Sequence, residues 1–344
     1  MTQISALNVN GPRPTLKTIA AETGLAVATV SRALSDAPDI GEATKTRVRA
    51  AALKLGYRPN RAGVRLRTGK TNVIALVLNA ESDVMNNTAK LLYSIANTLR
   101  GTPYHLVVMP IFQDQDPLDP VRYLVETGAA DGIIFNQTQA NDPRVSYLMT
   151  HHIPFATHGR SDMGLDHPYF DYDCYAFGQH ALSVLAQRDC KHVYAILPPR
   201  EHMYAQHMYA GLEQAALHLN VQLEIAQGFT SDTSGALIEE HVAARWQQGA
   251  RPDGIVSTST TGAMATVSAL EGLGLKIGQD FQLATKEAIQ FLHRFRREII
   301  VASEDVEWAG RSLARAVVDA IEGRPASAGQ QLQVPQLSDF KTGE

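Results

Sequence analysis

The sequence is poor in cysteine and has no long apolar run. Its 344 residues include two cysteines, Cys174 and Cys190, too few for a disulfide framework and far from CxxC spacing. No stretch of about 18 apolar residues is present, so no transmembrane helix is predicted. The first fourteen residues lack the apolar segment of a signal peptide. We therefore expect a cytoplasmic protein with no membrane partner, whose cysteines are buried free thiols.

Common catalytic and cofactor motifs are also missing. The sequence contains no GxSxG, no GxxxxGK[ST], no HExxH and no GxGxxG at the end of an expected strand. His151 and His152 are adjacent, without i,i+4 spacing and without a nearby Cys or Asp cluster, which argues against a metal site. The sequence therefore predicts neither an enzyme nor a bound metal or cofactor.

Charge is distributed unevenly along the chain. The net charge is −4, yet residues 1–70 carry twelve Lys and Arg against four Asp and Glu, a net of +8, and the remainder carries −12. A basic segment at one end of an acidic chain is typical of a domain that binds nucleic acid. The length suits two or three domains of about 100–200 residues each. We expect a small nucleic-acid-binding domain followed by a larger acidic body.

Residues 15–34, TLKTIAAETGLAVATVSRAL, have the pattern of two short helices joined at a glycine. Thr15 is suited to cap the first helix, and Gly24 can adopt the positive φ that lets the chain reverse. The second helix is expected over about 27–34, with Val30 and Leu34 facing inward. This pattern indicates a helix-turn-helix, in which the second helix lies in the major groove. For these two helices alone, a generic helical hairpin is the alternative.

The outward face of the second helix carries side chains suited to DNA. Val27 and Ala28 are small enough for close approach and for contact with thymine methyl groups, and the Arg32 guanidinium can bind guanine O6 and N7. Thr29 and Ser31 are suited to phosphate contacts, which fix the register without reading the bases. We therefore expect base contacts from the start of this helix and from Arg32.

A third helix is expected over about 42–55, closed by Gly56. The segment 61–72, RAGVRLRTGKTN, is basic and too short for a helix that persists alone, because nucleation costs more than a few hydrogen bonds return. We expect this segment to become ordered only on DNA, beside a second copy of itself.

From residue 73 onward, apolar runs of strand length alternate with helical segments. Such alternation predicts parallel sheets covered by helices, and the number of runs favours two doubly wound lobes over one sheet. Ligands of these folds bind at the carboxyl ends of the strands, which predicts a site in a cleft between the lobes. The expected strands are VIALVL, HLVVMP, GIIFN, FATHG, HVYAIL, LEIAQGF, GIVST, FQLAT and EIIVASE.

Three stretches near the start, TLKTIAAETGLAVATVSRAL, TRVRAAALKLGYRPN and NRAGVRLRTGK, resemble the DNA-binding headpiece of the LacI/GalR family of regulators. A weaker resemblance continues to about residue 335, where stretches such as IPFATHGR and EWAGRSLARAVVDAIEG are similar to the family's effector domain. It implies an N-terminal all-α helix-turn-helix headpiece plus an α/β periplasmic-binding-protein-like domain of two doubly wound lobes. The implied boundaries are 14–59 for the headpiece, 60–72 for a hinge helix and linker, and 73–340 for the effector-binding and dimerisation domain.

The resemblance also assigns DNA contacts. Val27 and Ala28 fall where the family's two main base-reading residues lie, Asn60 begins the hinge helix, and Leu66 falls where a leucine enters the minor groove and bends the duplex. Gly63 departs from the family at a hinge position that is usually alanine, which costs about 1 kcal/mol of helix propensity. The residues expected to contact DNA are Thr15, Val27, Ala28, Thr29, Ser31, Arg32, Tyr57, Asn60, Arg61 and Leu66.

The effector domain departs from the family's sugar-binding pattern at three places. Ser259-Thr260 stand where many members have Asn-Asp, the run 284–287 reads ATKE where many have GFDD, and Met208 stands where an arginine is frequent. Hydroxyl and ammonium groups thus replace carboxylates at two positions. This pattern leaves open an anionic sugar acid or phosphate held by charged donors, and a neutral oligosaccharide stacked on Tyr172 or Tyr204.

Three short stretches, THGR, LPPR and TKE, are similar to the branch of the family that senses raffinose-type and α-glucoside sugars, which favours a sugar. For Asp173 the alternative is a helix cap, and for His207 it is simple packing. The residues expected to bind the effector are Glu81, His158, Arg160, Asp171, Asp173, His202, Tyr204, His207, Thr260 and Lys286.

The resemblance implies a sequence-specific DNA-binding regulator. Members of the family commonly repress genes for carbohydrate uptake or catabolism and are released from DNA by a sugar-type effector. Other members need a corepressor to bind DNA, and the sequence leaves both modes of regulation open. A palindromic operator on double-stranded DNA requires two headpieces, so a homodimer is expected, and the short polar end LSDFKTGE offers no heptad tail for a tetramer. A free-standing sugar-binding protein, the alternative of another class, would need an export signal and no basic head.

Overall fold

The computed structural model describes residues 14–58, 63, 65, 68–79, 84–112, 114–249, 251–288 and 290–343. The chain divides into two units, Met1–Thr71 and Asn72–Glu344. Of the residues expected to bind DNA or effector, four lie outside the described residues: Asn60, Arg61, Leu66 and Glu81. The separate hinge segment 60–72 therefore stays a prediction.

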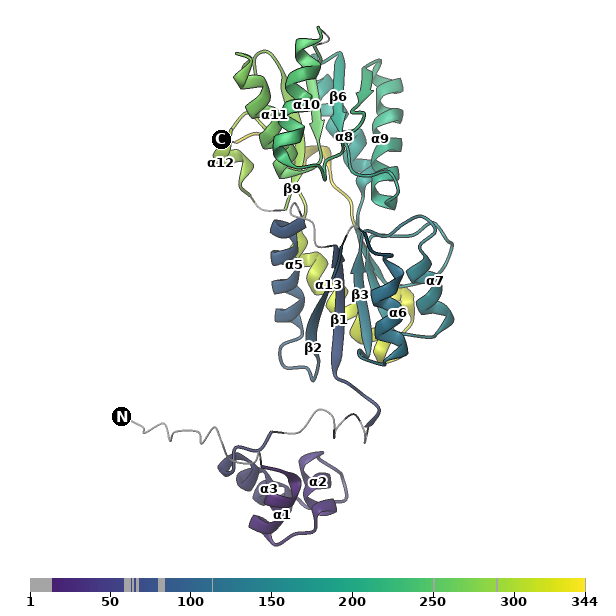
Figure 1. The fold of residues 1–344 in the computed structure, drawn as a ribbon, viewed down its shortest axis with the longest axis vertical. Helices are drawn as coiled ribbons and strands as arrows, with labels where there is room; N and C mark the ends of the chain where they lie inside the picture. Colours follow the sequence, from purple (N-terminus) through teal and green to yellow (C-terminus); the bar gives the residue numbers. More distant parts are fainter. Residues whose placement is uncertain are drawn as a thin grey trace, which may run out of the picture. The chain divides into compact units, whose positions relative to one another are not determined.

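In the described part of the first unit, helices α1, α2 and α3 pack around a small core (Figure 1). Ile19, Val30 and Val48, one from each helix, are completely buried. Leu34, expected to face inward, is only partly buried at the edge of this core, and Ala33 is buried instead. The helices are α1 (Leu16–Thr23), α2 (Val27–Leu34) and α3 (Glu42–Lys54).

The ends of these helices follow from their capping residues. The Thr15 hydroxyl accepts a hydrogen bond from the Thr18 backbone, whose side chain in turn accepts from the Thr15 backbone, forming a capping box. Gly24 ends α1 with a φ of 66°, which allows the predicted reversal. Ala26 precedes α2 and provides no side-chain cap. The helix-turn-helix predicted from the sequence is therefore present.

The second unit consists of two lobes, each built on a parallel sheet, as the sequence predicted (Figure 1). The first sheet has the order β11-β5-β4-β3-β1-β2 and the second has the order β10-β9-β8-β6-β7. The strands are β1 (Val73–Asn79), β2 (His105–Ile111), β3 (Gly132–Asn136), β4 (Phe155–His158), β5 (Tyr169–Tyr172), β6 (His192–Ile196), β7 (Gln222–Ile225), β8 (Gly254–Ser257), β9 (Gln282–Glu287), β10 (Ile300–Ser303) and β11 (Gln330–Gln333). The helices are α5 (Val84–Thr98), α6 (Leu118–Glu126), α7 (Pro143–Thr150), α8 (Cys174–Ala186), α9 (Met203–Leu219), α10 (Gly235–Gln247), α11 (Thr260–Gly272), α12 (Leu292–Phe295) and α13 (Val306–Ile321).

All nine expected strands are present, but the sequence reading missed β5 and β11. Strand β5 reads YFDY and β11 reads QQLQ, so neither has an apolar run, and the two pair with each other at one edge of the first sheet. The expected strand LEIAQGF was too long, because β7 ends at Ile225. Strand β11 is a polar edge strand, and β5, although buried between β11 and β4, has only four residues and includes Asp171, so neither gives an apolar run of strand length.

The faces of each sheet are covered by helices because side chains alternate along the strands. On β1, Ile74 and Leu76 contact the side covered by α5 and α13, whereas Ala75 and Val77 contact the side covered by α6 and α7. The second sheet is arranged likewise, with α8 and α9 on one face and α10 and α11 on the other. Both sheets are thus buried on both faces, as parallel sheets require.

The chain passes between the lobes three times. It leaves the first lobe after β5 and returns after β10, and α13 then packs beside α5 (Figure 1). After β11 it crosses again, and Lys341 forms an antiparallel bridge with Val301 of β10. The short polar end of the chain, which the sequence predicts to lack a heptad tail, therefore packs on the second lobe. Each crossing follows the end of a strand, so the boundary between the lobes lies at the carboxyl ends of both sheets.

Cys174 and Cys190 are buried free thiols, as the sequence predicts. Within the described ranges, no helix has both the length and the apolar character needed to cross a bilayer. The same part of the chain holds no cluster of three or more His, Cys, Asp or Glu arranged to bind a metal ion.

Candidate nucleic-acid interface and ligand cleft

Helix α2 presents the face that the sequence predicts for DNA. Val27 is 40% exposed, and Ala28 and Arg32 are also exposed, whereas Thr29 and Ser31 are partly buried. The opposite side of α2 is held in the core of the first unit. The start of the helix therefore offers small side chains and one guanidinium to a partner, which is the geometry of a recognition helix.

Two of the predicted DNA contacts already have structural roles, and a third has a competing partner. Thr15 caps α1. Tyr57 packs against the core of the first unit, and burial raises the pKa of its hydroxyl. The Arg32 guanidinium forms an exposed ion pair with Asp39, which lies in the turn beyond α2. A base contact by Arg32 would therefore require the guanidinium to exchange this carboxylate for the base.

The acidic residues of the first unit all form ion pairs with Lys or Arg side chains of its helices. Lys45 is 6% exposed, and its ammonium lies 3.0 Å from Asp36 and 2.9 Å from Glu42. Lys54 lies 2.7 Å from Glu22. The segment 58–70 contains five Lys and Arg and no acid. The positive excess of the first unit is therefore concentrated beyond α3, which the net charge alone did not reveal.

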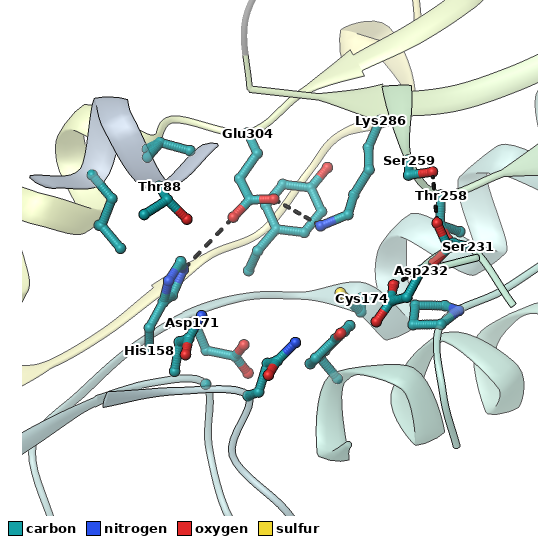
Figure 2. Close-up of a pocket in the computed structure, with 18 residues that line it drawn as sticks. Thr88, His158, Asp171, Cys174, Ser231, Asp232, Thr258, Ser259, Lys286 and Glu304 are labelled. Atoms are coloured by element: carbon teal, nitrogen blue, oxygen red, sulfur yellow. Dashed lines mark hydrogen bonds and ion pairs between the residues drawn. The ribbon is translucent and has the colours of Figure 1, made fainter. Parts of the chain in front are cut away.

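A cavity of about 180 Å³, which we call the inner cavity, lies between the two lobes of the second unit (Figure 2). It is lined by residues that follow β3, β4, β6, β7 and β8, by the end of β5, by Lys286 of β9 and by Glu304 after β10. Thr88 and Leu91 of α5 and Val306 of α13 complete its wall. The cavity is thus at the carboxyl ends of the strands, where the sequence predicts a ligand site.

The inner cavity contains a buried ion pair. The Lys286 ammonium lies 2.7 Å from Glu304, and the other carboxylate oxygen of Glu304 lies 3.7 Å from Nε2 of His158 (Figure 2). Burial alone would raise the pKa of Glu304, but the Lys286 charge and the nearby His158 imidazole outweigh it, so the pKa lies well below its usual range. Burial opposes protonation of Lys286, yet the Glu304 carboxylate raises its pKa. Both groups are therefore charged at neutral pH.

A second ion pair joins Arg160 to Asp171 at 2.6 Å. Asp171 is 3% exposed, and burial raises the pKa of its carboxyl even though Arg160 opposes that shift. Nearby on α9, burial and the Arg160 charge lower the pKa of His207. Arg160 thus holds Asp171 in place and does not itself line the cavity.

Two hydroxyl groups of the cavity lack a partner within the described structure. They are Oγ1 of Thr88 and the phenol oxygen of Tyr172, both buried. The Lys286 ammonium also lies 5.2 Å from the centre of the Tyr172 ring. A buried hydroxyl without a partner is costly, so both groups are suited to hydrogen bonds with a bound ligand.

The predicted effector residues separate into three groups. His158, Asp171, Tyr204 and Lys286 line the inner cavity. Three others lie outside it: Asp173 caps α8 by accepting from the Tyr175 and Ala176 backbones, Thr260 is the first residue of α11, and His207 lies on α9. Arg160 reaches the cavity only through Asp171, and His202 lines a neighbouring cavity.

Several lining residues were not anticipated. Asn136 ends strand GIIFN and Gln137 follows it, Asp232 follows β7, and Glu304 ends the run EIIVASE. Each is a polar residue at the carboxyl end of an expected strand, so their positions were a usable signal. Local sequence patterns do not pair Glu304 with Lys286, because only the fold brings the two residues together.

The neighbouring cavity, which we call the outer cavity, has a volume of about 440 Å³. It shares Asn136, Gln137 and Asp232 with the inner cavity, so the two cavities are adjacent. Beside it the lobes touch through backbone: the Met203 N–H donates to the Thr138 carbonyl over 2.8 Å, and residues 139 and 202 form an antiparallel bridge. The cleft therefore has two compartments and a backbone contact that holds the lobes together.

Comparison with known proteins agrees with this architecture. The profile described as "Bacterial regulatory proteins, lacI family" matches residues 15–60, and the profile described as "Periplasmic binding protein-like domain" matches residues 182–339. The HTH-type transcriptional regulator AglR of Rhizobium meliloti (strain 1021) is 30% identical over 334 residues, which cover 94% of this chain and 92% of that protein. The HTH-type transcriptional regulator RafR of Escherichia coli is 34% identical over 217 residues, 59% of this chain and 64% of that protein.

Solved structures share the fold. The lac repressor dimer bound to operator and the anti-inducer ONPF superimposes with a TM-score of 0.82 at 16% identity, covering 94% of this chain and 97% of that one. The transcriptional regulator CelR–cellobiose complex gives a TM-score of 0.65 at 21% identity, covering 94% and 98%. Together with the full-length relative, these matches show that the chain belongs to the lacI family of bacterial regulatory proteins, which are DNA-binding transcriptional regulators and not enzymes.

Proposed function

We propose that this regulator binds a palindromic operator as a homodimer and that a neutral sugar in the interlobe cleft changes its affinity for that operator. Val27, Ala28 and Arg32 contact bases, and the basic segment beyond α3 supplies phosphate contacts. A protein that binds an operator must share a compartment with DNA, which is the basis for a cytoplasmic location.

The charged residues that line the cleft are the reason for proposing a neutral ligand. Lys286 is the one Lys or Arg among the described residues of the inner cavity, and Arg144 is its counterpart in the outer cavity. Each already lies 2.7 Å from a carboxylate, Glu304 and Asp142 respectively. Asp232 adds further negative charge at the junction. An anionic ligand would have to displace these carboxylates, whereas sugar hydroxyls can accept from and donate to the groups as they stand.

The edge of the first sheet supports a homodimer. Strand β2 is an edge strand, and its Val107 and Val108 are 43% and 45% exposed. Tyr93 on α5 is 70% exposed. Exposed edge strands with apolar side chains are prone to association unless they are covered, and a second copy would cover this surface. Two headpieces would then be available for two half-sites.

Ligand binding would act through the angle between the lobes. Both lobes line the cleft, so a ligand there favours the arrangement in which both contact it. A differential affinity of about 1–3 kcal/mol between two arrangements is enough for 5- to 150-fold coupling to DNA. We propose that the regulator represses carbohydrate genes and that the effector, acting as an inducer, releases it from the operator. An effector that acted as a corepressor would have the opposite effect on operator binding.

The proposal is tested with the full-length protein in two steps. Selection from random duplex DNA at near-physiological salt should enrich a palindrome, and a chain without residues 1–70 should enrich none. A thermal-shift screen should then show stabilisation by neutral sugars, because a ligand of the folded state raises the unfolding temperature. Sugar acids and sugar phosphates serve as the matched controls, and stabilisation by these anions instead would contradict the neutral ligand. Failure to enrich any palindrome would overturn the operator assignment.

A further inference from the structure

Gln333, the last residue of β11, contacts all three crossings between the lobes. Its backbone carbonyl accepts a hydrogen bond from the Asp173 N–H over 2.8 Å, where the first crossing enters α8. Its side-chain oxygen accepts from the Asp305 N–H over 3.0 Å, in the second crossing. The third crossing begins at Gln333 itself. One residue therefore joins three segments that are far apart in the sequence.

The side chain of Gln333 also holds the backbone on both sides of Glu304. Its amide nitrogen lies 3.4 Å from the Ser303 carbonyl, while its amide oxygen accepts from Asp305. A primary amide has both a donor and an acceptor, so it can pair with backbone as a neighbouring strand does. The Glu304 N–H donates over 2.9 Å to the Glu287 carbonyl at the end of β9. The backbone around Glu304 is thus held by β9 and by Gln333.

Glu304 needs this support because it lies in a crossing and not in a strand. Its carboxylate lies 2.7 Å from the Lys286 ammonium, which a strand of the second sheet positions. The attraction between two charges falls with their distance, so the ion pair depends on where the backbone holds each residue. We infer that Gln333 is a positioning residue, which places the Glu304 carboxylate beside Lys286 and makes the three crossings move as one unit. The joint movement rests on the proposed coupling between lobe angle and operator binding.

A double-mutant cycle on the full-length protein tests the placement of Glu304. Gln333→Leu removes both side-chain contacts with little change in size. The loss of unfolding free energy caused by Glu304→Gln should then shrink by at least half in the Gln333→Leu background, because the ion pair is already disturbed. Gln331→Leu is the matched control, since Gln331 is exposed and lies on the same face of β11. An undiminished loss in the Gln333→Leu background would overturn the positioning role.

Hydrogen exchange of the wild-type protein gives a measurement that needs no variant. Asp305 is the N-cap of α13, so no carbonyl of that helix accepts its N–H. Protection of this amide therefore reports its bond to Gln333. Mass spectrometry resolved to single amides should show slowed exchange at Asp305, and exchange at the rate of a free amide would overturn the contact.

Operator binding tests the joint movement of the crossings. Without the Gln333 side chain, the effector-free protein should also populate lobe arrangements that bind the operator poorly. Gln333→Leu should therefore weaken operator binding at least threefold and leave affinity for random DNA unchanged. Operator affinity equal to that of Gln331→Leu would overturn the joint movement while the operator assignment stands. If the wild type selects no palindrome, the proposed function fails and the joint movement with it, whereas the double-mutant cycle still decides the placement of Glu304.

Discussion

The Lys286 ammonium lies 2.7 Å from the Glu304 carboxylate inside the interlobe cavity. Lys286 belongs to β9 in the second lobe, and Glu304 begins the segment through which the chain returns to the first. The pair therefore neutralises the charge of the site and connects the ligand cavity to one of the three crossings between the lobes. A ligand that altered this contact would therefore act on a segment that connects the two lobes.

Glu304→Gln should lower the free energy of unfolding of the second unit by about 3 kcal/mol. The change leaves the Lys286 charge buried without its partner, which is the costly way to disrupt a buried ion pair. Urea unfolding followed by tryptophan fluorescence measures this unit alone, because both tryptophans, Trp246 and Trp308, belong to it. The double variant Lys286→Met with Glu304→Gln is the control and should recover at least half of the loss. An equal or larger loss in the double variant would contradict the pairing.

The same pair predicts a pH dependence. The pKa of Glu304 is lower in the folded protein than in the unfolded chain, so its contribution is complete above the unfolded pKa of about 4.3 and is lost as the pH falls toward the folded value. The difference in unfolding free energy between the wild type and Glu304→Gln should therefore be constant above about pH 5 and shrink below about pH 4. Other carboxylates occur in both proteins and cancel. A difference that stays constant down to pH 3 would assign the effect to packing.

The fold was predictable where apolar residues recur with the spacing of a buried strand or helix. The nine apolar runs predicted nine strands, and Thr15 and Gly24 predicted the ends of α1. The two missed strands have only four residues each: QQLQ is a polar edge strand, and YFDY is buried but interrupted by Asp171. Hydrophobic periodicity needs a run of apolar residues, so short strands that contain polar residues escape it.

The candidate site was predictable in place but only partly in its members. Strand ends were expected to line the cleft, and His158, Asp171 and Lys286 do so. Asp173 was ambiguous because the same carboxylate suits a helix cap, and the structure uses it as one. Glu304 is far from Lys286 in sequence, and only the fold brings them together. An ion pair between residues far apart in the sequence depends on tertiary structure, which local sequence patterns do not encode.

In the headpiece, Asp39→Asn should raise affinity for both operator and random DNA by up to about fivefold. Asp39 pairs with Arg32 on the exposed face, and the neutral amide removes both the competing partner and a negative charge near the phosphates. Fluorescence anisotropy at fixed salt measures both affinities. Arg32→Ala is the comparison and should cost about 1–3 kcal/mol on the operator but much less on random DNA. Equal losses of Arg32→Ala on both DNAs would remove Arg32 from the base-reading set.

Met203→Pro should weaken effector binding by about two- to tenfold without disturbing helix α9. The Met203 N–H donates across the cleft to the Thr138 carbonyl, and proline lacks that donor. Met203 is the first residue of α9, where proline is favoured, and the preceding His202 has the extended backbone that a residue before proline adopts. Met203→Ala keeps the N–H and is the matched control. A loss of the interlobe bond destabilises the closed arrangement that contacts the ligand from both sides, so titration with the sugar that binds should separate the two variants. Equal affinities in the alanine and proline variants would show that this contact does not hold the cleft closed.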